Sequence, residues 1–199
     1  MESKTVTLKY EIKFLDFWHL GSGLSAGTRL DSLVVKDSDG LPFASGKTLK
    51  GLFREMAEIV EIDEKPELKK CNFVNICFGG SSDPKDVCYD ETKKDIEGEC
   101  YFTNATLSKE AKEQILYHRL KDNLYVEIAS TKIDEKGVAV DNSLREIEVV
   151  IPITLYGEIN DVPLKYVEKM KQSMKMVKRM GLNRNRGLGR CEISISEGL

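Results

Sequence analysis

The sequence of 199 residues predicts an α+β fold with a βαββαβ core of the ferredoxin-like or RRM-like kind. Two observations support this fold class. Segments of alternating apolar and polar residues predict strands near the start, in the middle and at the end of the chain, and two segments with apolar residues at helical spacing lie between them. The order strand, helix, strand, strand, helix, strand is that of two split βαβ units, whose helices pack on one face of an antiparallel sheet.

The first strand is predicted for TVTLKYEIKF, residues 5–14, and the first helix for GKTLKGLFREMAEIVE, residues 46–61. Ser45 is a suitable N-cap for this helix, and a long segment rich in Gly and Ser separates it from the strand. The apolar face of the strand consists of Val6, Leu8, Tyr10, Ile12 and Phe14. The apolar stripe of the helix consists of Leu49, Leu52, Phe53, Met56 and either Ile59 or Val60.

The remaining elements follow from the same periodicities. Residues 62–98 are polar and predict an irregular insertion lobe, after which GECYFTNATLS predicts the second strand. Two β-rich runs around IDEKGVAVDNS predict a hairpin insertion at residues 128–145, and the second run alternates from Ile147 to Leu155. VPLKYVEKMKQSMKMVKRM predicts the second helix, with its methionines in the core, and CEISI the last strand. Residues 1–199 are therefore expected to form one domain.

Composition narrows the class of function. The chain has 30 Lys and Arg against 33 Asp and Glu, a net charge of −3, so any site for a polyanion must be local. No run of apolar residues is long enough to span a membrane, and the charged N-terminal segment does not resemble a signal peptide. We therefore expect a cytoplasmic protein without a membrane partner.

Five cysteines, an odd number without a secretion signal, argue against a disulfide framework. Two interpretations stay open. The cysteines are ordinary reduced side chains, or four of them close one structural Zn²⁺ site. No CxxC pair is present, so the spacing is unlike that of a zinc finger. The four candidate ligands are Cys71, Cys77, Cys88 and Cys100.

The stretch LPFASGKTLKG, residues 41–51, ends like a nucleotide-binding P-loop but does not begin like one. That motif needs Gly where Leu41 stands, and Pro42 removes a backbone donor, so we do not expect an ATPase. Two interpretations remain: a capped amphipathic helix with a solvated basic face, or a helix N-terminus that meets a phosphate group. Similarly, GLNRNRGLGR, residues 181–190, is either a basic turn or a clamp for a phosphate backbone.

Four motifs in order resemble a known family. LDSLVVKDSDGLPFASGKTLKGLFR, CFGG followed by GECYFTNATLS, the hairpin insertion, and NRNRGLGRCEISI together resemble the repeat-associated mysterious protein (RAMP) superfamily, in particular the backbone subunits of type III CRISPR effector complexes. The resemblance extends from residue 5 to residue 197.

The resemblance implies a subunit that binds a guide (CRISPR) RNA and assembles with other RAMP subunits and copies of itself. The hairpin insertion would be a thumb between bases, and a complementary target RNA would pair with the guide. The residues implied in RNA binding are Ser45, Lys47, Thr48, Lys50 and Arg54 in the first helix, and Arg184, Arg186, Gly187, Gly189 and Arg190 in the glycine-rich loop.

The resemblance also implies a catalytic residue. Asp31 lies where the family's backbone subunits carry the aspartate needed for target-RNA cleavage, and its carboxylate could hold Mg²⁺ or Mn²⁺. Asp37 and Asp39 are instead expected in a turn.

Three alternatives remain. The chain could be a structural guide-binding subunit without catalysis. It could be a metal-independent, repeat-processing endoribonuclease that uses His19 or His118. It could also be an RRM-like module that stacks bases on Tyr10 and Tyr101 or Phe102.

Overall fold

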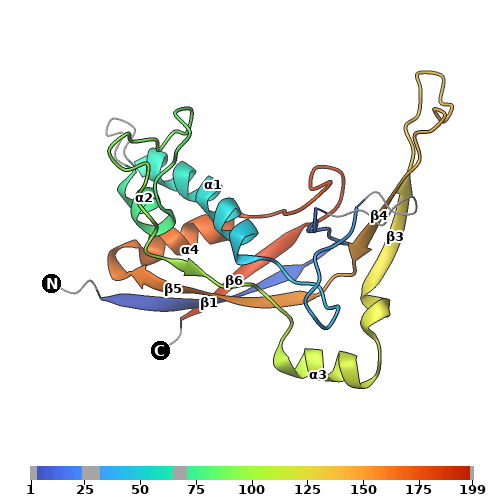
Figure 1. The fold of residues 1–199 in the computed structure, drawn as a ribbon, viewed down its shortest axis with the longest axis horizontal. Helices are drawn as coiled ribbons and strands as arrows, with labels where there is room; N and C mark the ends of the chain where they lie inside the picture. Colours follow the sequence, from blue (N-terminus) through green and yellow to red (C-terminus); the bar gives the residue numbers. More distant parts are fainter. Residues whose placement is uncertain (1–3, 24–31, 65–70, 198–199) are drawn as a thin grey trace.

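A four-stranded antiparallel sheet, covered on one face by two helices, forms the body of the protein (Figure 1). The computed structural model describes residues 4–23, 32–64 and 71–197. The strand order β2-β5-β1-β6, with one of the two covering helices between β1 and β2 and the other between β5 and β6, is the ferredoxin-like arrangement. The predicted α+β fold class is confirmed. The sheet consists of β1 (Thr5–Phe14), β2 (Tyr101–Phe102), β5 (Thr154–Pro163) and β6 (Cys191–Glu197), and the two helices are α1 (Gly46–Glu64) and α4 (Val167–Met176).

The core lies between the sheet and these helices, and its residues follow the predicted periodicities. The inward residues of β1 from Leu8 to Phe14 are buried, and Phe53 of α1 packs edge-on against Tyr10 with ring centroids 5.8 Å apart. Met170 and Met174 of α4 are fully buried, so their predicted place in the core is confirmed. Val60 rather than Ile59 completes the stripe of α1, because Ile59 is 48% exposed.

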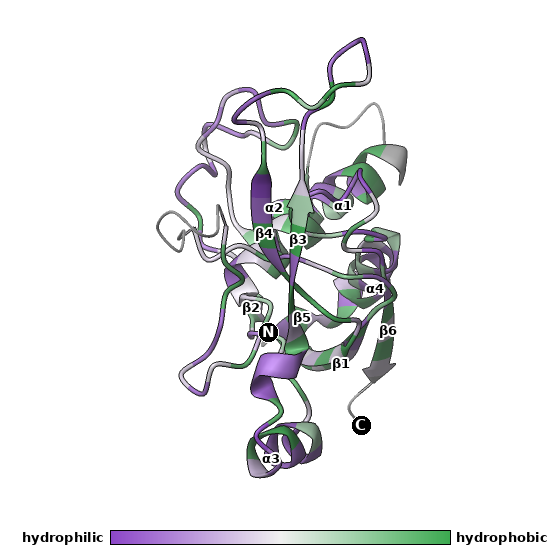
Figure 2. Cartoon of the chain, turned by 90° about the vertical axis from the view of Figure 1, so that its right-hand side faces the viewer, coloured by the Kyte–Doolittle hydropathy of each residue, from purple (hydrophilic) through white to green (hydrophobic). Residues whose placement is uncertain are grey.

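A second, two-stranded sheet projects from the body. It consists of β3 (Tyr125–Ser130) and β4 (Arg145–Val150), and it carries the irregular tip of residues 131–144 (Figures 1 and 2). The alternating run from Ile147 to Leu155 is therefore two strands. Pro152 lies between them, and since proline has no N–H for the ladder, the chain leaves one sheet there and enters the other.

The chain between β2 and β3 differs from the prediction. Only two residues of GECYFTNATLS pair as a strand, and α3 (Lys109–Tyr117) follows, then the short η1 (Lys121–Leu124). Ser108 caps α3, because its Oγ accepts a hydrogen bond from the Ala111 amide at 3.2 Å. No side chain of α3 is buried, which explains why apolar periodicity did not predict this helix.

The insertion lobe also contains a helix, α2 (Asn72–Phe78), so the prediction of an irregular segment is wrong there. Four apolar residues of α2 are buried: Phe73, Val74, Cys77 and Phe78. Its N-terminus is fixed to α1, because the Val74 amide donates to Glu61 Oε2 at 3.1 Å. Burial against α1 stabilises a seven-residue helix that would be unstable alone.

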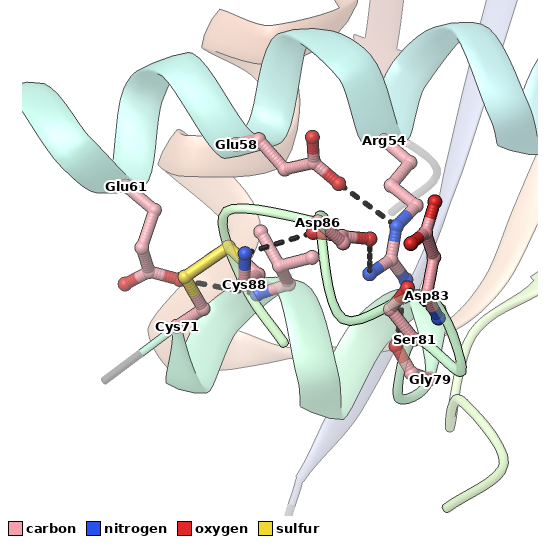
Figure 3. Close-up of polar contacts among 10 residues, drawn as sticks. Arg54, Glu58, Glu61, Cys71, Gly79, Ser81, Asp83, Asp86 and Cys88 are labelled. Atoms are coloured by element: carbon pink, nitrogen blue, oxygen red, sulfur yellow. Dashed lines mark hydrogen bonds and ion pairs between the residues drawn. A yellow bond between two sulfur atoms is a disulfide. The ribbon is translucent and has the colours of Figure 1, made fainter. Parts of the chain in front are cut away.

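The cysteines of the lobe correct two expectations. Cys71 and Cys88 form a disulfide (Figure 3), so the argument against disulfides was wrong. Cys77 and Cys100 are buried free thiols. Within the described ranges, no group of three or more His, Cys, Asp or Glu side chains could hold a metal ion. The predicted four-cysteine Zn²⁺ site is therefore not assembled, since the disulfide removes two of its four thiolates.

Arg54 anchors the lobe to α1, although the sequence suggested that it contacts RNA. Its guanidinium donates to Glu58 Oε1 at 2.9 Å, the Gly79 carbonyl at 2.7 Å and Asp86 Oδ2 at 3.2 Å (Figure 3). Burial alone would raise the pKa of Asp86. Hydrogen bonds from Ser81 and the Cys88 amide, together with the charge of Arg54, bring this pKa below its usual value. All three branches of the guanidinium are thus engaged within the protein.

The disulfide can be tested by thiol counting and by unfolding. We expect three thiols in the unfolded, unreduced chain and five after reduction. The double substitution Cys71→Ser/Cys88→Ser should lower the free energy of unfolding by about 3 kcal/mol, because the crosslink spans 17 residues. Cys191→Ser, at a free buried cysteine, is the control for loss of a sulfur alone. Five thiols without reduction, together with one equivalent of zinc, would restore the zinc interpretation.

Candidate nucleic-acid interface

The glycine-rich loop, residues 181–190, is fixed to the segment of residues 17–20. The Gly189 amide donates to the Phe17 carbonyl at 2.8 Å, and the Leu182 amide donates to the His19 carbonyl at 2.9 Å. Gly181 has φ 91°, and a Cβ there would lie 2.2 Å from the His19 oxygen. Only glycine allows this close contact, so the glycines at the base of the loop determine where its arginines lie.

The same segment holds the base of the β3–β4 ribbon. Trp18 and Val150 exchange two backbone hydrogen bonds, at 3.0 and 2.8 Å. His19 Nδ1 lies 2.5 Å from the Glu148 carbonyl oxygen. Because a carbonyl can only accept, Nδ1 carries the hydrogen and Nε2 accepts from Ser32 Oγ at 2.9 Å. The ribbon, the loop and residue 32 are therefore fixed relative to one another.

The side chain of Glu148 completes this junction. It is buried, and its two oxygens accept from the Val34 amide at 3.0 Å and from Lys36 Nζ at 2.7 Å. Lys36 also lies over the ring of Tyr125 in β3, 3.9 Å from the centroid. Buried charged groups in proteins are usually both paired and hydrogen-bonded, and Glu148 has both kinds of contact.

The N-terminus of α1 is largely satisfied from within the protein. Ser45 Oγ accepts from the Thr48 amide at 3.2 Å, which confirms the predicted N-cap, and Asn104 Oδ1 accepts from the Gly46 amide at 2.8 Å. The Lys47 amide has no partner within the part of the chain that the structure describes. The helix end therefore offers one free amide, its dipole, and the side chains of Lys47 and Lys50.

Gly51 is a feature of this helix that the sequence analysis missed. It is exposed on α1, and a Cβ at this position would meet nothing within 4 Å. Glycine inside a helix costs about 1 kcal/mol relative to alanine, and nothing inside the protein requires it here. The surface beside Lys47 and Lys50 is thus open to close approach from outside.

The arginines of the loop differ in their surroundings. Arg184 lies 3.9 Å from Glu55, which shows that the loop reaches the third turn of α1. Arg186 and Arg190 are exposed and have no carboxylate partner among the described residues. Gly187 has φ 89° and open space around it, whereas Gly189 is buried and serves the base of the loop.

Arg179 joins this group, although it lies outside the motif used to predict the site. Its Nη1 donates to the Arg184 carbonyl at 3.4 Å. The sequence signal was the concentration of basic residues toward the end of the predicted second helix, where cations also interact favourably with the helix dipole.

Figure 1 shows how these parts are arranged. The glycine-rich loop, in orange-red, lies between α1 and the β3–β4 ribbon. Of the predicted RNA-binding residues, Lys47, Thr48, Arg184, Arg186, Gly187 and Arg190 are exposed around this region, and Ser45 and Lys50 are half-buried there.

Asp31 lies outside the described residues. Asp37 and Asp39 lie in the expected turn. Asp37 Oδ1 accepts from the Asp39 and Leu41 amides at 2.9 Å, and both carboxylates pair with Lys112 of α3.

The alternative assignments find little support in the geometry. His19 is 1% exposed and both ring nitrogens are engaged, so it cannot reach a substrate. His118 is exposed and packs edge-on against Tyr117. Tyr10 and Phe102 are buried and cannot stack on bases, while Tyr101 is 65% exposed on the edge strand.

No helix in the described part of the chain is long and apolar enough to cross a membrane. No curated protein matches the sequence. Solved structures that resemble the fold include two of the type III-B Cmr-beta complex. The type III-B Cmr-beta structure bound to cognate target RNA has a TM-score of 0.67 at 12% identity, covering 97% of this chain and 98% of the other. The apo Cmr-beta structure has a TM-score of 0.63 at 13% identity, covering 96% and 97%.

The family model of the RAMP superfamily matches residues 11–192, from the first strand to the last. With the ferredoxin-like sheet, the projecting ribbon and the glycine-rich loop in place, this match shows that the chain belongs to the RAMP superfamily.

Proposed function

We propose that this protein is a guide-RNA-binding subunit of a type III CRISPR RNA-guided complex. The observation that carries the proposal is the position of the arginine-bearing loop. It is fixed between α1 and the ribbon, and its exposed Arg186 and Arg190 have no carboxylate partner among the described residues. The similar structures belong to type III-B Cmr-beta complexes, one of them bound to target RNA.

Binding would depend on the phosphate backbone. Arginine supplies forked donors and lysine a point charge, and neither reads the base sequence when it contacts phosphate. Gly51 and Gly187 leave room for a backbone to approach the protein. At the ribbon tip, Ile133 and Val138 are exposed apolar side chains that could pack against a base and separate it from its neighbour. The guide would thus be held extended, with complementary target RNA paired to it and further RAMP subunits or copies of this chain along it.

Cleavage of the target is the second part of the proposal. RNA can cleave itself when a 2′-hydroxyl is held in line with its adjacent phosphorus, so orientation supplies much of the catalysis. Asp31 would contribute one carboxylate beside the scissile phosphate. Its neighbour in sequence, Ser32, is fixed by His19 Nε2 at 2.9 Å.

Mg²⁺ or Mn²⁺, if bound there, would stabilise developing negative charge. Mg²⁺ commonly uses one or two carboxylates together with substrate phosphates, so a single Asp is a sufficient protein contribution.

The loop can be tested by removing its charges. Replacing Arg184, Arg186 and Arg190 with Gln should weaken binding of single-stranded RNA roughly equally for different sequences. The slope of log affinity against log salt should decrease by about 2, because three phosphate contacts are lost. Affinity measured over a salt series checks this result, and an unchanged slope would refute the clamp.

Substitutions at Gly51 distinguish an effect on the stability of α1 from an effect on RNA binding. Gly51→Ala should raise the free energy of unfolding by about 0.5–1 kcal/mol through helix propensity. Gly51→Leu should fold normally but bind RNA more weakly, because the larger side chain occupies the space for the backbone. Gln114→Leu, on the exposed surface of α3, is the matched control. Equal RNA affinities for Gly51→Leu and its control would place the RNA elsewhere.

The catalytic assignment predicts a separation of binding from cleavage. The assembled complex should cut complementary RNA at regular intervals, leave complementary DNA intact for want of the 2′-hydroxyl, and stop on addition of EDTA. Asp31→Ala should abolish cutting, with target binding within a few-fold of wild type. Asp39→Ala, in the turn, is the control. Cutting that survives Asp31→Ala would leave this chain a structural subunit, and parallel loss of binding would make Asp31 structural.

A further inference from the structure

Three lysines lie along α4 and just past its C-terminal end: Lys171, Lys175 and Lys178. Lys171 and Lys175 are four residues apart and lie on one side of the helix. Lys178 follows in the extended segment just past the helix end, where it lines the same hollow as the other two. Lys171 pairs with Glu168 at 2.8 Å. Lys175 and Lys178 are exposed and have no carboxylate partner within the described residues.

These two lysines border two shallow hollows. One, of about 390 Å³, lies along α4, and the other, of about 480 Å³, lies between α4 and the edge strand β6. Lys175 and Lys178 line both hollows, so they join them into one depression. Glu168 also lines the first hollow and Glu192 the second.

Beyond the helix, two arginines face each other. Arg179 and Arg190 are bridge partners on antiparallel segments, held by hydrogen bonds of the Met180 amide to the Gly189 carbonyl and of the Cys191 amide to the Lys178 carbonyl, both at 2.9 Å. Like charges directly opposite one another destabilise a strand pair. A helix dipole stabilises cations in the last turn of α4 but not a pair of arginines past its end. A bound polyanion would offset this repulsion.

The arginine pair connects these lysines to the glycine-rich loop. Arg190 belongs to that loop, and Arg179 donates to the carbonyl of Arg184 within it. Exposed cations therefore continue from the loop through Arg190 and Arg179 to Lys178 and Lys175.

We propose that Lys175, Lys178, Arg179 and Arg190 form a second contact track for the phosphate backbone of single-stranded RNA, continuous with the glycine-rich loop. This inference rests on the proposed function and extends it, because it lengthens the RNA segment that one subunit contacts. The occupant is a phosphate backbone because the track consists of point charges and forked donors along a shallow surface.

The track is tested by RNA length. The full chain, as wild type and as Lys175→Gln/Lys178→Gln, is titrated with fluorescent single-stranded RNAs of about 6 and about 20 nucleotides. OB folds that bind single strands contact about 4–16 nucleotides, so the short RNA is chosen to cover the loop alone and the long RNA to cover the loop and the track. The variant should bind the long RNA about tenfold more weakly at low salt, with a salt slope smaller by about 1.4, and the short RNA unchanged. Lys109→Gln/Lys121→Gln on and after α3 removes the same charge elsewhere and should bind both RNAs as wild type does.

Each other outcome overturns the track. Wild-type affinity and salt slope of the variant for the long RNA, with binding still lost on changing Arg184, Arg186 and Arg190, would refute the track and leave the proposed function intact. If the α3 control weakens binding of the long RNA equally, the loss of affinity comes from the change in net charge and not from the track. If the Lys175→Gln/Lys178→Gln variant binds RNA as wild type does but self-associates differently, the depression binds an acidic segment of another protein copy. Absence of RNA binding by wild type in every format would remove the proposed function and the track together.

Discussion

The structure depends on the backbone of residues 17–20, which holds three otherwise separate parts of the chain. Its carbonyls and amides bond to the glycine-rich loop, to β4 and, through Leu20, to the Val35 amide at 2.9 Å. The loop can approach this closely only where it has no side chain. At Gly181 and Gly189 a Cβ would lie about 2 Å from a carbonyl oxygen. Because this segment follows β1 directly, the central sheet determines where the loop and the ribbon base are held. A surface built from distant segments thus acquires one fixed geometry.

The second constraint is the separation of internal cations from external ones. Arg54, Lys36 and Lys112 are paired with carboxylates that lie 32 to 112 positions away in the sequence. Lys47, Arg186 and Arg190 have no such partners among the described residues. The paired cations hold the lobe, the ribbon base and α3 to the body, and the others remain available to a ligand. A basic residue serves one purpose or the other according to which carboxylate the fold brings beside it.

This separation explains how far the sequence could be interpreted. Local periodicity was sufficient for β1, α1 and α4, whose buried residues recur at fixed intervals, and for the Ser45 cap. It could not assign Arg54, because its partners Gly79 and Asp86 depend on the fold of the lobe. It failed for the cysteines for the same reason, since the fold of the lobe, with α2 between them in sequence, brings Cys71 and Cys88 together. Pro152, by contrast, was a visible signal that the alternating run would divide.

The slightly acidic net charge of the chain is compatible with a local site for a polyanion. At physiological ionic strength, charges separated by more than about 8 Å are largely screened, so a polyanion responds to the cations within its reach and hardly to the total of −3. A single chain with a few phosphate contacts would bind RNA weakly. Subunits arranged along one RNA make each further contact effectively intramolecular, and their combined affinity can exceed that of one chain by orders of magnitude. For the proposed RNA-binding subunit, a locally basic surface on an acidic protein would therefore favour assembly on a long RNA over binding of short fragments.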